Sequence, residues 1–145
     1  MKPILTKDQS FFLDDFCVKN NIISKNKLMD NAGKLSAQFF VEKIKNPFNQ
    51  KVLVLAGKGD NGGDAIIMHH YLKMYGIESK LYIINKTKVN SLIKTYSILN
   101  SDILKKINNS ILDGFNWFID GIFGIGLNRE VKSPYKEIIQ KLKNR

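Results

Sequence analysis

The sequence has a single cysteine and no apolar run of membrane-spanning length. With only Cys17 among its 145 residues, the chain cannot form an internal disulfide, and no metal-ligand spacing surrounds that cysteine. No stretch reaches the roughly 18 apolar residues that a spanning helix needs. The N-terminal segment "MKPILTKDQSFFLDD" has acidic residues where a secretory signal would continue its apolar region. We therefore expect a cytoplasmic protein without a membrane segment.

The sequence also lacks internal repeats, low-complexity segments and an interdomain linker. A length of 145 residues suits one domain, residues 1–145, with one core. The formal net charge of +10 would attract polyanions such as nucleic acids or anionic metabolites. However, the lysines are scattered, and no aromatic-basic recognition pattern accompanies them. Nucleic acid is therefore not a favoured partner.

Helix-like and strand-like segments alternate along most of the chain. Apolar periodicity and turn residues predict helices over 8–20, 26–44, 64–75, 89–107 and 134–142. Short apolar runs bounded by turn residues predict strands over 52–56, 79–84 and 115–120. Strands that alternate with helices are typical of a parallel sheet joined by right-handed crossovers. The sequence therefore predicts an α/β fold with a mainly parallel sheet, preceded by N-terminal helices.

Two predicted helices, 26–44 and 64–75, have residues whose caps and burial can be predicted individually. In the second predicted helix, Asn26 can cap the start, and the apolar spacing predicts a buried face formed by Leu28, Ala32, Leu35 and Phe39. A glycine in mid-helix costs about 1 kcal/mol relative to alanine, so Gly33 indicates either a close neighbour or tolerance of a small residue. His69 and His70 are adjacent on the following helix, point in different directions, and are expected to be partly exposed.

A glycine-rich loop joins the first predicted strand to the next helix. Gly57, Gly59 and Gly62 in "LAGKGDNGGDA" (55–65) match the spacing of the dinucleotide fingerprint, in which the backbone approaches a pyrophosphate above a helix N-terminus. That fingerprint also needs an acidic residue after the second strand to hold a ribose. The chain has the segment 85–88, "NKTK", there instead. A conventional NAD(P)-dependent oxidoreductase is therefore an alternative, but one that lacks the acidic residue that usually binds the ribose.

Polar side chains in the loop indicate more than a phosphate cradle. The carboxylates of Asp60 and Asp64 would repel a pyrophosphate unless a cation or hydrogen-bond donors balance them, although Asp64 could instead cap the helix. Asn61 could adopt a left-handed turn conformation. Asp120 ends the third predicted strand, just before a second glycine loop. Because ligands bind at the carboxyl ends of parallel strands, Asn61 and Asp120 could meet there as hard oxygen ligands for an alkali or alkaline-earth cation.

Three separate motifs carry a family resemblance. "LMDNAG" (28–33), the loop "LAGKGDNGGDA", and "FIDGIFGIGLNREVKSPYKEII" (118–139) follow one another in an order and spacing that resemble the N-terminal YjeF domain family, the NAD(P)H-hydrate epimerases. The resemblance covers almost the whole chain. It implies a Rossmann-like three-layer sandwich, a homodimer, and an isomerase that interconverts the R and S epimers of hydrated NADH and NADPH. A partner dehydratase would then complete the repair of the damaged cofactor.

The resemblance also implies roles for individual residues. A potassium ion would be held by Asn61 and Asp120. The substrate contacts that it implies are Asp60, Asn61, Gly62, Gly63, Asp64, Gly124, Ile125, Gly126, Leu127, Asn128, Arg129, Glu130 and Tyr135. Asp120 is also the candidate acid or base, because a carboxylate can move the proton that epimerisation requires; a role as cation ligand alone is the alternative.

This chain departs from the family pattern in three places. The family usually has asparagine at the position of Asp60 and glycine at that of Ala65. It also continues into a strand with an aspartate and an "IPSG"-like turn, whereas this chain ends at Arg145, so the resemblance implies a domain shortened at its C-terminus. A noncatalytic nucleotide- or nucleic-acid-binding module remains the alternative of a different class.

Overall fold

A computed structural model describes residues 4–84 and 89–143, so segment 85–88, considered above as a ribose site, lies outside the described residues. The elements in chain order are α1 (Lys7–Lys19), α2 (Lys25–Lys43), η1 (Pro47–Asn49), β1 (Lys51–Ala56), α3 (Asp60–Met74), β2 (Glu78–Ile83), α4 (Asn90–Thr95), η3 (Asn100–Asp102), α5 (Asn109–Leu112), β3 (Trp117–Gly121) and α6 (Tyr135–Lys143). Strands and helices alternate from β1 onward, as the sequence predicts.

The sheet has three parallel strands in the order β2-β1-β3. β1 is central, and its residues from Val52 to Ala56 are fully buried, as expected of a strand covered on both faces. The chain crosses from β1 to β2 on one side and later returns to β3 on the other. The strand order therefore reverses at β1, and in such sheets the ligand site lies at the carboxyl ends of the strands beside this reversal.

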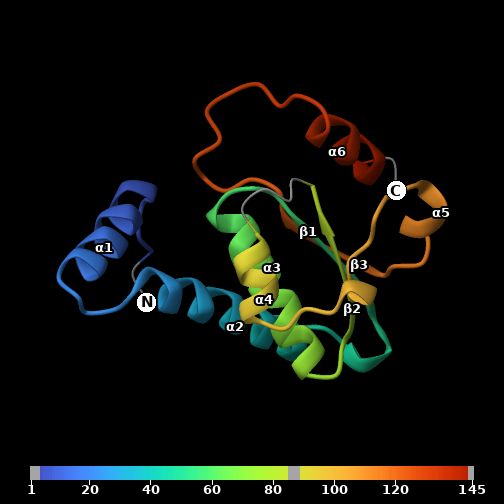
Figure 1. Ribbon diagram of the computed structural model, residues 1–145, viewed down its shortest axis with the longest axis horizontal. Helices are drawn as coiled ribbons and strands as arrows, with labels where there is room; N and C mark the ends of the chain where they lie inside the picture. Colours follow the sequence, from blue (N-terminus) through green and yellow to red (C-terminus); the bar gives the residue numbers. More distant parts are fainter. Residues whose placement is uncertain (1–3, 85–88, 144–145) are drawn as a thin grey trace.

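Helices cover both faces of the sheet (Figure 1). On one face Val52, Val54 and Ala56 pack into a core with α2, α3 and α4, while on the other face Leu53 and Leu55 pack with α5 and α6. The side chains alternate between the two cores because successive strand residues point to opposite faces. The fold is thus the predicted three-layer α/β sandwich with N-terminal helices.

α2 and α3 pack closely through a glycine. A Cβ built on Gly33 would lie 2.6 Å from Ile67 Cγ2 and 2.9 Å from the Met68 backbone nitrogen, so a close neighbour explains this glycine. The buried face of α2 consists of Gly33, Ala37 and Phe40. The predicted face was therefore wrong in part, since Leu35 and Phe39 remain 63% and 62% exposed. The predicted cap was also wrong, because Ser24 Oγ, not Asn26, accepts the Lys27 N–H.

α1 stands apart from the rest of the molecule (Figure 1). A capping box between Thr6 and Gln9 fixes its start. None of its thirteen residues, all of which the structure describes, is buried. Within the described part of the chain, no helix combines the length and the apolar composition that crossing a membrane would require.

The predicted helix over 89–107 was wrong beyond its first turns. α4 ends at Thr95, and Ser97 then adopts a left-handed backbone conformation (φ 50°) that turns the chain. The segment continues beside β2, where Ile103 forms a parallel bridge with Leu81. Buried Asp102 fixes this path through ion pairs with Lys73 and Lys80 at 3.3 Å and 3.0 Å. Tertiary contacts thus override the local helical pattern.

His69 lies in the core, contrary to the expectation of partial exposure. Its side chain is 1% exposed, and its Nδ1 is hydrogen bonded to Ser79 Oγ at 2.8 Å. Burial lowers the pKa of His69 to about 4, because the charged imidazolium would lose its hydration. His70 lies against the rings of Tyr71 and Tyr96 and is only partly buried.

Acid is therefore expected to destabilise the fold through His69. A histidine that titrates near 6.5 when unfolded and near 4 when folded binds more protons in the unfolded state. Its contribution is complete above about pH 6.5 and falls as the pH is lowered towards 4, with about 2 kcal/mol lost by about pH 5. Urea denaturation from about pH 7 to pH 4.5 measures the loss. His69→Gln, which does not titrate, is the control, and equal acid sensitivity in both proteins would contradict this assignment.

Candidate functional site at the carboxyl ends of the strands

The glycine-rich loop runs directly from β1 into α3. The helix begins at Asp60 with Gly59 as its N-cap, so Asp64 lies in the second turn and the prediction that it caps the helix was wrong. Asn61 lies in the first helical turn, and the expected left-handed turn was also wrong. The early start of α3 leaves Asp60, Asn61 and Asp64 near the positive end of the helix dipole, which favours anionic groups.

The first and second loops are joined through their backbones. Gly57 N–H donates to Gly121 O at 3.0 Å. A Cβ on Gly57 would lie 2.0 Å from Ile122 O, a distance that no side chain can occupy. Gly62 in turn lies against Gly57, with its built Cβ 2.0 Å from Gly57 O. The glycine spacing therefore allows three segments of backbone to meet above β1 and β3.

Asn61 bridges the two loops. Its Nδ2 donates to Phe123 O at 3.0 Å, and a Cβ built on Gly124 would lie 3.3 Å from Asn61 Cβ. The backbone carbonyl oxygen of Asn61 is 3.1 Å from the position of a Cβ built on Gly121, the residue that follows Asp120. No hydrogen bond from residues 4–84 or 89–143 reaches its side-chain oxygen. That oxygen remains available at the end of the sheet.

Asp120 lies at the same end of the sheet, opposite Leu55 of β1. Its Oδ1 accepts the Ile122 N–H at 2.9 Å, which holds the carboxylate at the start of the second loop. Within the described residues its Oδ2 accepts no hydrogen bond, and the side chain is exposed. Asn61 and Asp120 thus each offer one oxygen beside the junction of the two loops.

The chemistry of these two oxygens suits a hard cation. Amide, carboxylate and backbone carbonyl oxygens are ligands for alkali and alkaline-earth ions rather than for soft transition metals. Across the described ranges, no group of three or more His, Cys, Asp or Glu side chains is placed to hold a metal ion.

A lysine balances part of the negative charge in the first loop. Lys25 Nζ, at the start of α2, lies 3.1 Å from Asp60 Oδ2. Both groups are largely exposed, so the pair contributes little to stability, but it offsets the charge that Asp60 adds to the loop. Burial, together with the negative charges of Asp60 and Asp14, raises the pKa of Asp64 to about 6. Asp64 can therefore hold a proton at mildly acidic pH, which reduces repulsion of an anionic ligand.

Packing explains Ala65, which stands where the family usually has glycine. A Cβ built on Gly121 would lie 2.3 Å from Ala65 Cβ. The methyl group of Ala65 therefore fills the space beside Gly121 where the first turns of α3 cross β3. Gly63 lies against a different neighbour, because its built Cβ would be 2.7 Å from Met29 Sδ in α2. Gly63 and Ala65 position α3 through packing.

A cavity of about 460 Å³ lies between the two loops. Its lining residues are Lys58, Phe123, Leu127, Arg129, Glu130, Val131, Lys132, Ser133 and Tyr135. Four of the predicted contacts, namely Leu127, Arg129, Glu130 and Tyr135, line this cavity together. Gly124, Ile125, Gly126 and Asn128 belong to the same loop but do not line it.

Sequence reasoning missed five residues of this cavity, namely Lys58, Phe123, Val131, Lys132 and Ser133. Lys58 lies within the glycine-rich motif itself, so its position in the motif could have indicated it. Phe123 and residues 131–133 flank the predicted segment 124–130, and a wider boundary for the second loop would have included them. The Phe123 and Tyr135 rings lie 5.0 Å apart, measured between their centroids, in the wall of the cavity.

The parallel sheet, its reversal at β1 and the glycine-rich loop before α3 define a Rossmann-like α/β protein. The chain belongs to the family described as YjeF-related protein N-terminus, whose family model matches residues 25–145. A crystal structure of the yeast protein ynu0 superposes with a TM-score of 0.77 over 99% of this chain and 65% of that chain. At 20% sequence identity, this likeness shows the fold alone.

Several curated relatives carry names that refer to hydrated nicotinamide cofactors. The chain is 32% identical over 90% of its length to the NAD(P)H-hydrate epimerase of Elusimicrobium minutum and covers 64% of that protein. It is 27% identical to the NAD(P)H-hydrate epimerase of Entamoeba histolytica, of which it covers 62%. It is 31% identical to the bifunctional NAD(P)H-hydrate repair enzyme Nnr of Dictyoglomus turgidum, of which it covers 29%. The chain thus spans from about three tenths to about two thirds of these relatives.

Proposed function

We propose that the chain is part of a cytoplasmic NAD(P)H-hydrate epimerase, an isomerase that interconverts the R and S forms of hydrated NADH and NADPH in cofactor repair. The main support is the junction of the two loops, where Asn61 donates to Phe123 O and Asp120, near the end of β3, accepts the Ile122 N–H at the start of the second loop. A nucleotide at this junction would contact both motifs that the family resemblance assigns to the substrate. Residues 1–145 then form part of one YjeF N-terminal domain.

Each part of the junction has a distinct task in the proposed reaction. The N-terminus of α3 and the backbone of segment 60–64 would face an anionic group of the substrate, because free N–H groups and the helix dipole attract anions. Segment 124–130 and Tyr135 would cover the other side of the bound substrate. Asp120, whose Oδ2 has no partner among the described residues, would move the proton as the hydroxyl-bearing carbon is inverted by loss and return of water or by ring opening.

Potassium is the cofactor in this proposal. The Asn61 side-chain oxygen and Asp120 would hold the ion, and nearby backbone carbonyls could add further oxygen ligands. A bound cation supplies positive charge that offsets the loop's aspartates beside an anionic nucleotide. If Asp120 only binds the ion, another carboxylate must move the proton; Asp64, with its pKa raised to about 6, is a candidate within this chain.

Direct measurement of epimer exchange tests the function. Purified R and S forms of hydrated NADPH are mixed separately with the protein in potassium buffer, and chromatography follows the approach to the common equilibrium. We expect faster exchange than in protein-free buffer. Turnover of an alcohol or carbonyl with intact NADPH would instead support the oxidoreductase alternative. Salt-sensitive binding of DNA or RNA without exchange would support the nucleic-acid-binding module.

A dehydratase is the expected functional partner. An epimerase alone does not remove the added water, so a second activity must regenerate the intact cofactor. The Dictyoglomus relative is named a bifunctional repair enzyme, and this chain covers only 29% of it. We propose that this chain supplies the correct epimer to such a dehydratase, whether on a separate chain or in the same one.

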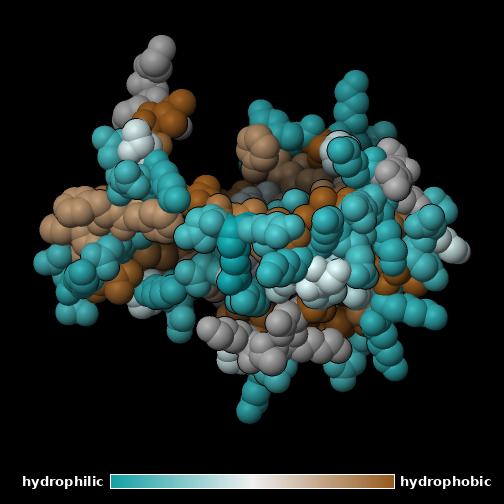
Figure 2. All heavy atoms as spheres, turned by 90° about the horizontal axis from the view of Figure 1, so that it is seen from above, coloured by the Kyte–Doolittle hydropathy of each residue, from teal (hydrophilic) through white to brown (hydrophobic). Residues whose placement is uncertain are grey.

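The proposed enzyme is a homodimer, and the exposed apolar end of the molecule supports this. Phe11, Phe12, Leu13 and Phe16 of α1 are 47% to 71% exposed, and Figure 2 shows apolar side chains gathered at the α1 end. A helix of this length is only marginally stable in water without a packing partner. Because α1 buries none of its own residues, we propose that it packs on a second copy of the chain.

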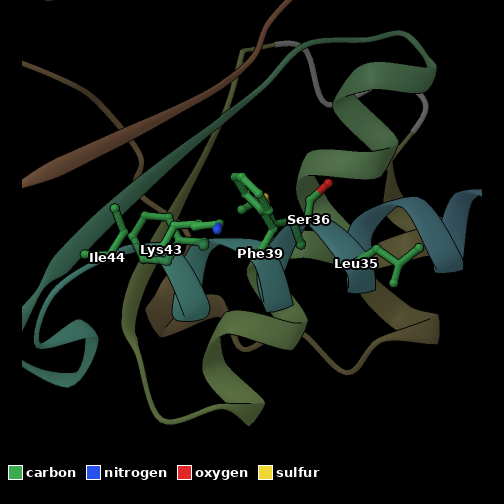
Figure 3. Close-up of a pocket in the computed structure, with 7 residues that line it drawn as sticks. Leu35, Ser36, Phe39, Lys43 and Ile44 are labelled. Carbon is green, nitrogen blue, oxygen red and sulfur yellow. The ribbon is translucent and has the colours of Figure 1, made fainter. Parts of the chain in front are cut away.

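A groove on α2 offers a surface for that second copy. The groove has a volume of about 460 Å³, and Figure 3 shows side chains projecting along it from successive turns of α2. Its lining residues are Leu35, Ser36, Phe39, Phe40, Lys43, Ile44 and Met68. Its one charged lining residue is Lys43, whereas α1 carries three aspartates and two lysines, a net charge of −1 in a chain of +10. Apolar surface and charge are therefore complementary.

Phe12→Asp is expected to weaken the dimer by at least about tenfold in Kd, because a charge would replace an exposed aromatic anchor of the interface. Sedimentation velocity over a range of protein concentrations measures the change. Phe12 is 71% exposed, so the folded monomer should tolerate the variant. The control is Leu99→Asp, at a residue 63% exposed on the η3 turn. Equal association of both variants and the parent would exclude α1 from the interface.

A further inference from the structure

The cavity between the two loops has an excess of positive charge. Lys58 reaches it from the first loop, while Arg129 and Lys132 reach it from the segment between β3 and α6. Among the described residues of the lining, Glu130 is the only carboxylate, which leaves a formal excess of two positive charges. Among the residues that the structure describes, none of the three cations forms an ion pair. Like charges that outnumber their counter-charges are unfavourable unless an anion joins them.

The rest of the lining is suited to a planar or sugar-bearing ligand. The rings of Phe123 and Tyr135 form one wall at a centroid separation of 5.0 Å. The Tyr135 hydroxyl is buried, and it has no hydrogen-bond partner within residues 4–84 and 89–143. Buried hydroxyl groups are rarely left unpaired, so this wall lacks a polar partner that a ligand or an ordered water would supply. Cations, aromatic rings and a free donor together match a phosphate-bearing nucleotide.

We propose that this cavity is a phosphate subsite, and that Lys58 and Lys132 bind a phosphate group of the nucleotide while Arg129 closes its open side. The inference rests on the proposed function for the identity of the nucleotide, but not for the chemistry of the subsite. The phosphate is either the pyrophosphate that NADH and NADPH share or the ribose 2′-phosphate that only NADPH carries. In the second case these lysines determine the preference between the two hydrated cofactors.

Lys58 lies in the first loop but outside segment 60–64, which holds the predicted substrate contacts of that loop. It precedes the N-cap of α3 and lines the cavity with Lys132 of the second loop. A phosphate here would therefore contact both loops at once and connect them in the bound state. Ligand binding and the relative position of the loops are thus coupled through these two lysines.

Calorimetric titration with NADP⁺ and with NAD⁺ tests the subsite without any turnover. We expect Lys58→Ala and Lys132→Ala each to raise the Kd for NADP⁺ about tenfold, because each removes a charge-assisted contact. The matched control is Lys136→Ala, at an exposed lysine of α6 that does not line the cavity. Lys132→Arg, which keeps the charge, should retain most of the affinity.

The two cofactors distinguish the sources of the phosphate. An equal loss for NAD⁺ and NADP⁺ assigns the pyrophosphate, and a loss confined to NADP⁺ assigns the 2′-phosphate; both outcomes support the subsite. Affinities equal to those of Lys136→Ala for both lysine variants would overturn it, as would the absence of binding of either cofactor to the parent protein. If binding falls as expected but the parent shows no epimer exchange, the subsite stands and the proposed function fails.

Discussion

Gly57→Ala is expected to destabilise the protein by more than about 3 kcal/mol, close to the upper end of what overpacking causes. The added methyl group would lie 2.0 Å from the Ile122 backbone oxygen. Backbone cannot move aside as a flexible side chain can, so the two loops must separate. That separation would also break the bond from Gly57 N to Gly121 O, and any binding that needs both loops would be lost with it.

Gly59→Ala is the matched control for this variant. Gly59 lies two residues further along the same loop, and a Cβ there would meet nothing within 4 Å. Alanine is a poorer N-cap than glycine, so we expect a loss of only about 0.5–1 kcal/mol. Urea denaturation of the three proteins measures the difference. Similar stabilities of Gly57→Ala and Gly59→Ala would show that the loops are not held in contact as described.

The sheet and the last helix could be predicted because their signals are local. β1 is a short branched apolar run that ends at a glycine, and the observed strand, Lys51–Ala56, differs from the prediction by one residue. Pro134, a residue favoured in the first turn of a helix, similarly indicates α6, which begins at Tyr135. In these segments, propensity, apolar pattern and turn chemistry agree with the tertiary structure, and local reasoning is sufficient.

Predictions failed where tertiary packing decides the outcome. α2 buries a face centred on Gly33 and Ala37, because small residues let α3 approach closely, whereas its larger apolar residues Leu35 and Phe39 point outward. Apolar spacing alone cannot separate a face that packs within the chain from one left for a partner. His69 is buried because Ser79 of β2 supplies its hydrogen bond, a contact that no local pattern encodes.

In the candidate site, too, residues in local motifs could be predicted, whereas residues brought together only by the fold could not. The spacing of the glycines and the order of the two loops indicated that Asn61 and Asp120 would lie at neighbouring strand ends, and the structure places both beside the loop junction. The cations around the cavity could not be assigned in this way. Lysines are frequent and scattered in this chain, so a single position such as Lys132 becomes informative only when the fold brings it beside Lys58.

Asp120→Asn is expected to lower the rate of epimer exchange at least about 100-fold and to abolish its response to potassium, if the carboxylate both moves the proton and holds the ion. The amide keeps an oxygen that can accept the Ile122 N–H, so the turn after β3 should persist. Asp120→Ala removes that acceptor as well and should lose a similar amount of activity together with some stability. Exchange rates in potassium and in lithium buffers, with thermal melts, separate the two effects.

The response of the Asp120→Asn exchange rate to potassium identifies the role of Asp120. A pure cation ligand would leave slow exchange in Asp120→Asn that high potassium restores, because a neutral amide oxygen still binds the ion weakly. An acid or base would leave exchange that no potassium concentration restores, since the amide cannot accept the proton at neutral pH. Exchange at the parent rate in both variants would exclude Asp120 from the reaction.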